Sequence, residues 1–151
     1  KLQMVFDEGL YDPANEPDIA YAYLFSRFPG EEWRTQREVR RLLDTCFTTA
    51  ADGIPGNDDT GTMSAWAVFS MMGFYPDCPG EPYYTLTAPV FDRVEIATER
   101  GPLVIEAERP AAGAGYIGRM TLGGRPLGKY RLSHDELLGG GRLKFELKND
   151  K

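Results

Sequence analysis

The chain contains little cysteine and histidine: two cysteines and one histidine among 151 residues. Cys46 and Cys78 cannot form the multiple disulfides that stabilise many small secreted folds. They also fall short of the about four closely spaced ligands of a structural zinc site. The sequence leaves open whether the two form one bridge or stay free. It favours buried thiols, because free cysteine is among the most buried residue types.

Long apolar runs and an excess of positive charge are also missing. No apolar run approaches the roughly 20 residues that a membrane-spanning helix needs. The net charge of −6 argues against nucleic acid, because a phosphate-binding surface needs clustered Lys and Arg. Basic residues cluster in one helical pattern, interleaved with acidic ones: Glu31, Glu32, Arg34, Arg37, Glu38, Arg40, Arg41 and Asp44. We therefore expect a solvated, salt-bridged helix face and no nucleic-acid or membrane partner.

The spacing of apolar residues predicts helices over about 15–28, 31–47 and 62–73, whereas residues 1–13 show no sustained period. The third helix is apolar nearly all round, which predicts a buried core helix with Trp66 inside. Beyond Gly73 the pattern changes to short β-branched and aromatic runs, at 83–86, 90–96, 103–107, 116–122 and 143–147. These predict the strands of an antiparallel sheet and hence an α+β fold.

Polar residues concentrate in one loop directly before the third predicted helix. Asn57, Asp58 and Asp59 lie between Gly56 and Gly61, and loops held by a rigid scaffold often carry catalytic residues. The same cluster is typical of a helix N-cap. Local chemistry leaves both interpretations open and favours capping.

The longer string around this loop resembles the signature of glycoside hydrolase family 92, a group of calcium-dependent exo-acting α-mannosidases that invert anomeric configuration. The resemblance covers nearly the whole chain. Its segments are Asn15-Glu16-Pro17-Asp18, Trp33-Arg34-Thr35-Gln36, Asp52-Gly53-Ile54-Pro55-Gly56-Asn57-Asp58-Asp59, Gly73-Phe74-Tyr75-Pro76, Cys78-Pro79-Gly80 and Tyr116 to Gly124.

The resemblance implies late helices of an (α/α)6 barrel over residues 1–76, followed by a small antiparallel β-sheet or sandwich unit over 77–151. The family's enzymes are several times longer than this chain. Because the chain also begins at Lys1 without an initiator Met or a signal peptide, we expect a portion of a larger polypeptide. A secreted or periplasmic location would suit such an enzyme, although nothing in the chain encodes one.

The function implied by the resemblance is hydrolysis of α-linked mannose, for example α-1,2-linked, from mannans or N-glycans. Inversion needs an acid and a base about 6.5–9.5 Å apart, so the adjacent Asp58 and Asp59 cannot serve as both. By the family pattern Asp59 is the general base, Asn57 occupies a second catalytic position that is acidic in some members, and Asp58 contacts substrate. The general acid would come from an upstream segment, so this chain alone is expected to be catalytically incomplete.

Calcium is the cofactor that the resemblance implies. Asn15 would be a calcium ligand and Glu16 a sugar contact, while locally Asn15 fits a helix N-cap equally well. Ile19, Ala20 and Tyr21 stand where the family often has histidines, which leaves the cleaved linkage open.

Two rival functions remain. A non-catalytic carbohydrate-binding or assembly module would present Trp66, Tyr83 and Tyr84 as exposed rings, whereas an enzyme segment predicts a buried Trp66 and an Asp59 that faces a cleft. Alternatively, the helices dock on further protein and expose apolar patches in isolation. The single histidine, His134, is expected to make a structural hydrogen bond, because consecutive Ser133, His134 and Asp135 cannot converge as a triad.

Overall fold

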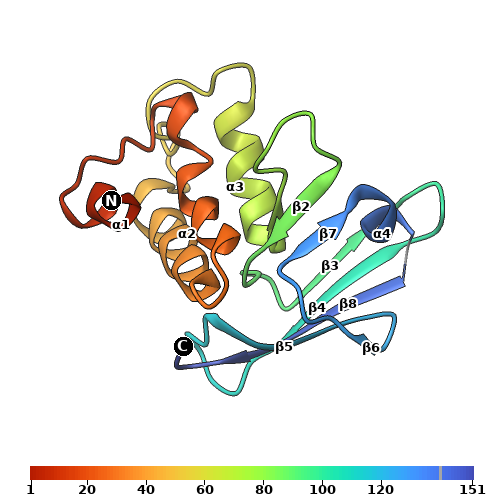
Figure 1. The fold of residues 1–151 in the computed structure, drawn as a ribbon. Coiled ribbons are helices and arrows are strands. Elements are labelled where there is room, and N and C mark those ends of the chain that lie inside the picture. Colours follow the sequence, from red (N-terminus) through yellow and green to blue (C-terminus); the bar gives the residue numbers. More distant parts are fainter. Residues whose placement is uncertain (140) are drawn as a thin grey trace.

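The computed structural model describes residues 1–139 and 141–151, and it has a helical half followed by a β half (Figure 1). The helical half contains α1 (Leu2–Asp7), the 3-10 helices η1 (Glu16–Asp18) and η2 (Tyr21–Arg27), α2 (Glu32–Cys46) and α3 (Thr62–Met72). The chain leaves α3 at Gly73, whose φ of +98° lies in the left-handed region that favours glycine. It then enters the first strand, β1 (Phe74–Tyr75).

The β half has two sheets. The first has the order β1-β2-β7, with β2 at Tyr83–Leu86 and β7 at Arg131–Ser133. The second has the order β3-β4-β8-β5-β6, with strands Arg93–Ile96, Leu103–Glu108, Gly141–Lys148, Tyr116–Leu122 and Arg125–Pro126. The short helix α4 (His134–Leu138) follows β7. The strands pair antiparallel except for β4 and β8, which run parallel.

The predicted helices at 31–47 and 62–73 are confirmed, and so are the five predicted strands, with β3 beginning only at Arg93. The helix expected over 15–28 is wrong as one α-helix. Its turns close by i→i+3 bonds, for example from Asp18 N to Asn15 O at 2.9 Å and from Tyr23 N to Ala20 O at 3.0 Å. The apolar spacing in this segment correctly marks Ala22, Tyr23 and Phe25 as buried. Over so short a run, however, it does not distinguish a 3-10 helix from an α-helix.

The helical half surrounds an aromatic core. Trp66 is 2% exposed, as expected, and its ring stacks on Phe47 and meets Tyr23 and Tyr75. The helix α3 is nevertheless not buried all round, because Val68 is 49% exposed. The expectation of complete burial is wrong for that face.

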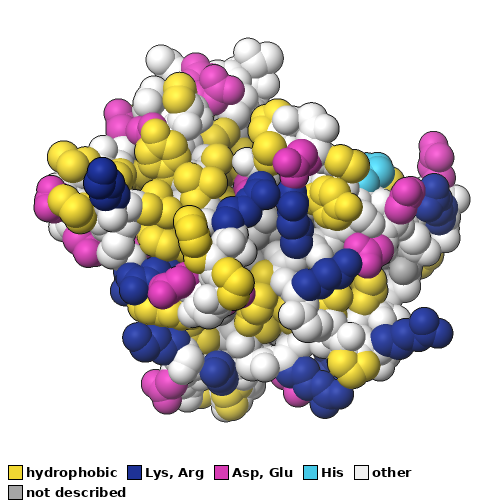
Figure 2. Space-filling view, in the orientation of Figure 1, with side chains coloured by type: hydrophobic (Ala, Val, Ile, Leu, Met, Phe, Trp, Pro, Cys, Tyr) yellow, Lys and Arg dark blue, Asp and Glu magenta, His cyan; other side chains and the backbone are white. Residues whose placement is uncertain are grey.

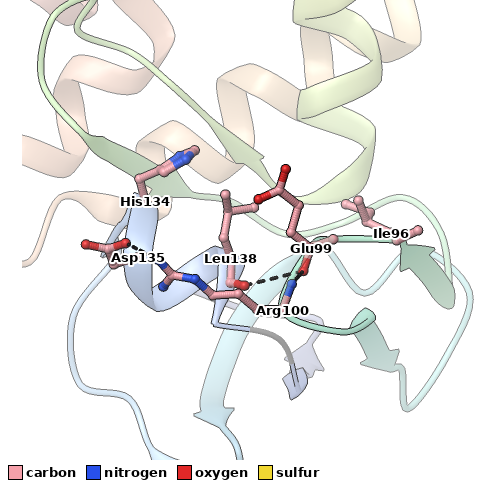
Figure 3. Close-up of a pocket in the computed structure, with 8 residues that line it drawn as sticks. Ile96, Glu99, Arg100, His134, Asp135 and Leu138 are labelled. Atoms are coloured by element: carbon pink, nitrogen blue, oxygen red, sulfur yellow. Dashed lines mark hydrogen bonds and ion pairs between the residues drawn. The ribbon is translucent and has the colours of Figure 1, made fainter.

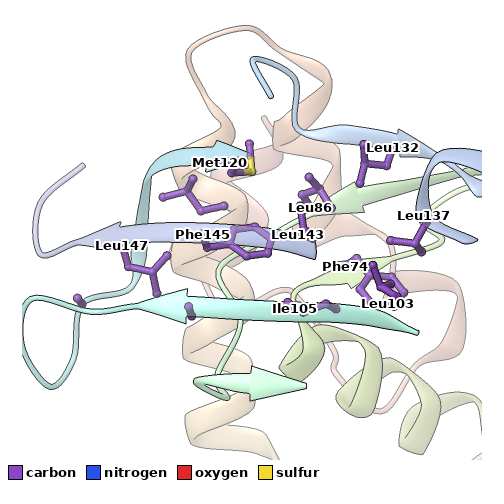
Figure 4. Close-up of a cluster of buried hydrophobic side chains, with 13 residues drawn as sticks. Phe74, Leu86, Leu103, Ile105, Met120, Leu132, Leu137, Leu143, Phe145 and Leu147 are labelled. Atoms are coloured by element: carbon purple, nitrogen blue, oxygen red, sulfur yellow. The ribbon is translucent and has the colours of Figure 1, made fainter. Parts of the chain in front are cut away.

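The β half has its own aliphatic core, which Figure 4 shows between the sheets. Alternate residues of β8 point into it, namely Leu143, Phe145 and Leu147. Phe74 belongs to this core, while Tyr75 belongs to the aromatic one. The two cores meet at adjacent residues of β1, and the expected division at residue 76 stays a prediction.

Two smaller expectations have clear outcomes. Cys46 and Cys78 are free, which answers a question that the sequence left open. Both are half-buried, so the favoured full burial of the thiols is not seen. The basic residues of α2 are paired with acidic ones, as expected; Arg37 and Arg41 both hold the buried Glu38, at 2.7 and 2.8 Å. Burial opposes ionisation of Glu38, but the hydrogen bonds from the two guanidinium groups outweigh it and hold its pKa below the usual value.

Candidate active-site loop

The loop before α3 has an unusual backbone. Asp59, Thr60 and Gly61 all take left-handed conformations, with φ of +48°, +62° and +89°. Aspartate tolerates this region, but a β-branched threonine rarely occupies it. Strain of this kind costs about 1–3 kcal/mol and gathers at functional sites. The surrounding structure must therefore hold this turn in place.

Hydrogen bonds from the first turn of α3 hold it. The Thr62 hydroxyl donates to the Asp59 carbonyl at 2.7 Å, and the Thr62 amide donates to the same oxygen at 3.3 Å. The Met63 amide donates to the Asp58 carbonyl at 3.2 Å. These hydrogen bonds fix Asp59 through its backbone carbonyl and do not involve its carboxylate.

Asp58 performs the capping role that the sequence left open. Its Oδ1 accepts from the Ser64 amide at 2.8 Å, and its Oδ2 accepts from the Ser64 hydroxyl at 2.9 Å. Both carboxylate oxygens are therefore engaged with the first turn of α3. A substrate contact by Asp58 stays a prediction.

Asn57 and Asp59 are exposed on the same loop. Within the described residues, the Asp59 carboxylate has no hydrogen-bond partner, in contrast to its neighbour Asp58. A carboxylate that is fixed by its backbone and free at its oxygens can accept a proton from water. In this structure the side chain of Asp59 faces solvent. The cleft that an enzyme would place in front of Asp59 stays a prediction.

The two polar segments singled out from the sequence are in contact. Gly56, at φ +65°, approaches Ala14 so closely that a Cβ placed on it would lie 2.6 Å from the Ala14 Cβ. The Trp66 indole also donates to the Ile19 carbonyl at 2.9 Å. These contacts anchor both ends of the Asn15–Glu16 segment, one against the loop and the other against α3.

Asn15 occupies the N-cap position of η1, but its side chain makes no capping hydrogen bond. The amide and the neighbouring Glu16 carboxylate are both exposed. Calcium binds six to eight such oxygens, so these two groups fit it in kind. Among the described residues, however, no three His, Cys, Asp or Glu side chains gather closely enough to hold a metal ion. Asn15 and Glu16 would therefore form only part of a ligand set.

A hollow of about 270 Å³ adjoins Glu16, and Tyr75, Pro76 and Asp77 at the end of β1 form another part of its wall. Asp77 is buried there. Its Oδ2 accepts from Arg27 at 2.9 Å and its Oδ1 accepts from Thr85 at 2.7 Å. This wall is therefore tied both to η2 and to β2.

Another hollow, of about 480 Å³, lies in the β half beside α4 (Figure 3). His134 Nδ1 is 2.8 Å from the Tyr84 hydroxyl, which confirms the expected structural hydrogen bond. Asp135 points elsewhere and pairs with Arg100 at 3.2 Å (Figure 3). Ser133 caps α4 by accepting from the Glu136 amide. These three residues serve separate structural purposes and form no triad.

Sequence reasoning missed four residues of this region. Thr62 and Ser64 stood out only as part of the predicted helix at 62–73. Tyr75 appeared only within a segment of the family resemblance, and Asp77 gave no signal, because their partners lie far away in the sequence. The carboxylate of Asp77, for instance, meets Arg27 across 50 positions.

Comparison with known proteins identifies the class to which this fold and loop belong. The family model of the glycosyl hydrolase family 92 catalytic domain matches residues 1–149. The chain belongs to glycosyl hydrolase family 92. The resemblance seen in the sequence and the expected α+β fold class are confirmed.

Solved structures of similar proteins agree. A family GH92 α-mannosidase from Bacteroides thetaiotaomicron is 29% identical, with a TM-score of 0.87 over 94% of this chain and 19% of its own. An inverting mannosidase of the same family and organism is 35% identical, with a TM-score of 0.85 over 98% of this chain and 20% of its own. The chain spans about a fifth of the length of these relatives.

A curated relative from Arthroderma benhamiae is 28% identical over 97% of this chain and 19% of its own length, and it is described as an uncharacterised secreted glycosidase. In residues 1–139 and 141–151, no helix combines the length and the apolar character needed to span a membrane.

Proposed function

We propose that this chain is the part of an inverting exo-α-mannosidase that carries the general base, Asp59. The observation that carries the proposal is the pairing of family membership with the loop itself: an exposed carboxylate on a strained, firmly bonded turn. The solved relatives named as an α-mannosidase and as an inverting mannosidase support mannose as the sugar. The substrate would be a mannose-containing oligosaccharide of a mannan or N-glycan.

The residues of this chain would divide the work. Asp59 accepts a proton from a water molecule that attacks the anomeric carbon, and Thr62 keeps the carbonyl of Asp59 in place. Asn57, two residues earlier on the loop, presents an amide to the same water or to the sugar. Asp58 maintains the start of α3 through Ser64. Protonation of the leaving oxygen requires a second carboxyl on the opposite face.

That second carboxyl would belong to the part of the enzyme that precedes this chain. No segment here resembles the family region that supplies it. The remaining amino-terminal part is thus the proposed partner, and the chain alone is proposed to be inactive. The description of the fungal relative supports a secreted enzyme.

Asn15 would bind calcium, and Glu16 would bind the sugar next to it. When bound, calcium would grip two sugar hydroxyls and help to distort the ring. The contact between Gly56 and Ala14 supports this arrangement, because it holds the Asn15 segment against the loop that carries Asp59.

A carbohydrate-binding module without catalysis fits the structure less well. Trp66 is 2% exposed and forms the centre of the aromatic core, so it offers no ring surface to a sugar. Tyr83 is exposed, but the guanidinium carbon of Arg131 lies over its ring, 4.5 Å from the centroid.

The test is to give the enzyme that contains this chain an α-linked mannobiose and to follow the anomer of the released mannose by proton NMR. We expect β-mannose first, loss of activity with a calcium chelator, and a fall in kcat of about 10²- to 10⁴-fold for Asp59→Ala. Asp52→Ala, an exposed carboxylate on the same segment, is the matched control and should keep full activity. Release of α-mannose first, or no release, would refute the proposal.

A further inference from the structure

The segment that carries Asn15 and Glu16 has an unusual helix type. It forms the 3-10 helices η1 and η2, and the two residues between them, Ile19 and Ala20, also have right-handed helical backbone angles. The segment is therefore nearly continuous helix from Glu16 to Arg27. A 3-10 helix longer than three or four residues is uncommon, because its hydrogen-bond geometry is poor. The seven residues of η2 must therefore be held by contacts with the rest of the protein.

Two hydrogen bonds between hydroxyl groups attach η2 to the helical half. The Tyr23 hydroxyl lies 2.6 Å from that of Ser70 in α3. The Ser26 hydroxyl donates to that of Thr35 in α2 at 2.9 Å. Both bonds restrain η2 from the side of the helices. Contact with the β half is made by the last residue of η2, Arg27.

Arg27 makes this contact mainly through Asp77. Its Nε and Nη2 both donate to Asp77 Oδ2, at 3.2 and 2.9 Å, and the hydroxyl of Thr85 in β2 donates to Oδ1 at 2.7 Å. The Asp77 side chain is 1% exposed, so salt and water screen this ion pair little. Arg27 also approaches Glu81, at 4.0 Å, but that side chain is 47% exposed and such a pair contributes little. The pair with Asp77 therefore fixes Arg27.

Asp77 also lies close to the residues proposed to bind calcium and sugar. It lines the same hollow as Glu16 and Ala20. Its amide donates to the Tyr75 carbonyl at 3.1 Å, which attaches it to the end of β1. The ion pair thus joins the last residue of the helical segment to a strand beside its first residues. Because Glu16 and Arg27 belong to one helical segment, a displaced Arg27 also displaces Glu16.

We propose that the ion pair between Arg27 and Asp77 is a positioning contact. It fixes the orientation of the segment from Asn15 to Arg27, and so places Asn15 and Glu16 to bind calcium and sugar. Arg27 and Asp77 act through these two residues and are not ligands themselves. The inference rests on the proposed function, because that proposal assigns calcium and sugar binding to Asn15 and Glu16.

The test measures calcium affinity of the enzyme that contains this chain, by titration calorimetry with calcium chloride. Arg27→Met keeps the aliphatic stem without the charge, and Asp77→Asn keeps an oxygen for Thr85. Each variant should raise the Kd for calcium, and the KM for the mannobiose, about tenfold. At saturating calcium and substrate, kcat should stay near the parent value, because Asp59 is unchanged.

The double variant Arg27→Met/Asp77→Asn separates positioning from stability. Removal of one partner of a buried pair leaves the other charge unpaired and lowers the unfolding midpoint, whereas removal of both leaves no unpaired charge. The double variant should therefore recover most of the unfolding midpoint, yet still bind calcium about tenfold more weakly than the parent. A pair that only stabilises the fold would recover both.

Glu38→Gln is the matched control, because Glu38 is also a buried carboxylate that arginines hold, with its side chain 4% exposed. It should lower the unfolding midpoint and leave the Kd for calcium and the KM unchanged. Recovery of calcium affinity in the double variant, or an equal loss in Glu38→Gln, would overturn the positioning role and leave the proposed function standing. An enzyme that neither releases β-mannose nor binds calcium would overturn both.

Discussion

The helical half and the β half of this chain bury their apolar side chains to different extents. In the β half, aliphatic residues of both sheets close around one another, and the large exposed hydrophobic residues are Tyr83 and Phe91. In the helical half, Met4, Leu10, Phe28 and Val68 are exposed by 49–65%. Figure 2 shows hydrophobic side chains gathered over this half.

The two halves also differ in how polar groups are placed. The β half keeps a regular pattern, with buried and outward residues alternating along β4 and β8. The helical half contains the left-handed turn at Asp59 and Thr60. It also contains Asn15, whose side-chain amide makes no capping hydrogen bond. Regular packing stabilises the fold, whereas catalytic and binding residues are more often found on irregular or strained backbone with free polar side chains.

The strongest test of this contrast replaces one large core residue in each half. Trp66→Ala and Phe145→Ala should each lower the free energy of unfolding by about 3–5 kcal/mol. Only Trp66→Ala should also reduce kcat/KM of the folded enzyme, because its indole anchors the Ile19 carbonyl next to Asn15 and Glu16. Urea unfolding and steady-state kinetics below the melting range measure both. An equal kinetic loss for Phe145→Ala would contradict the division of roles.

A second test loosens the contact between the two polar segments. Gly56→Ala and Gly9→Ala meet nearly the same backbone strain, at φ +65° and +66°, but only the first clashes with Ala14. Gly9→Ala should cost about 1 kcal/mol, and Gly56→Ala about 1–3 kcal/mol more. Gly56→Ala should also raise the calcium concentration needed for half-maximal activity. No difference between the two variants in stability or calcium dependence would show that the contact is unimportant.

The smallest effect concerns Asp58, where capping and substrate contact make different predictions. Asp58→Ala removes the acceptor for Ser64 and should cost about 1 kcal/mol. Asp58→Asn keeps an oxygen for the Ser64 amide and should cost less. If capping is the whole role, neither variant changes KM. A raised KM in Asp58→Asn at unchanged stability would instead support the substrate contact.

Much of the local structure could be predicted from the sequence. The apolar period located α2 and α3, and the β-branched runs located β2, β4, β5 and β8. Some short elements escaped, such as α1, β6 and β7, because their residues show no clear helical or strand period. The type of helix at 16–27 also escaped, because apolar spacing over such short turns fits both forms.

The candidate site was also predicted only in part from the sequence. Glycines and carboxylates in a row marked the loop at 56–61, and a family resemblance assigned roles to Asn15, Glu16 and Asp59. Local chemistry could not decide between capping and catalysis for Asp58. The hydrogen bonds to Ser64 support capping.

By itself, the sequence determined the class of fold, the family and the burial of Trp66, since these depend on composition, spacing and order along the chain. Only the tertiary structure decided that Gly56 lies against Ala14, that Asp77 meets Arg27, and that Tyr75 closes a hollow beside Glu16. Each of these contacts joins residues more than 40 positions apart. Their geometry follows from how whole elements pack, which no local pattern records.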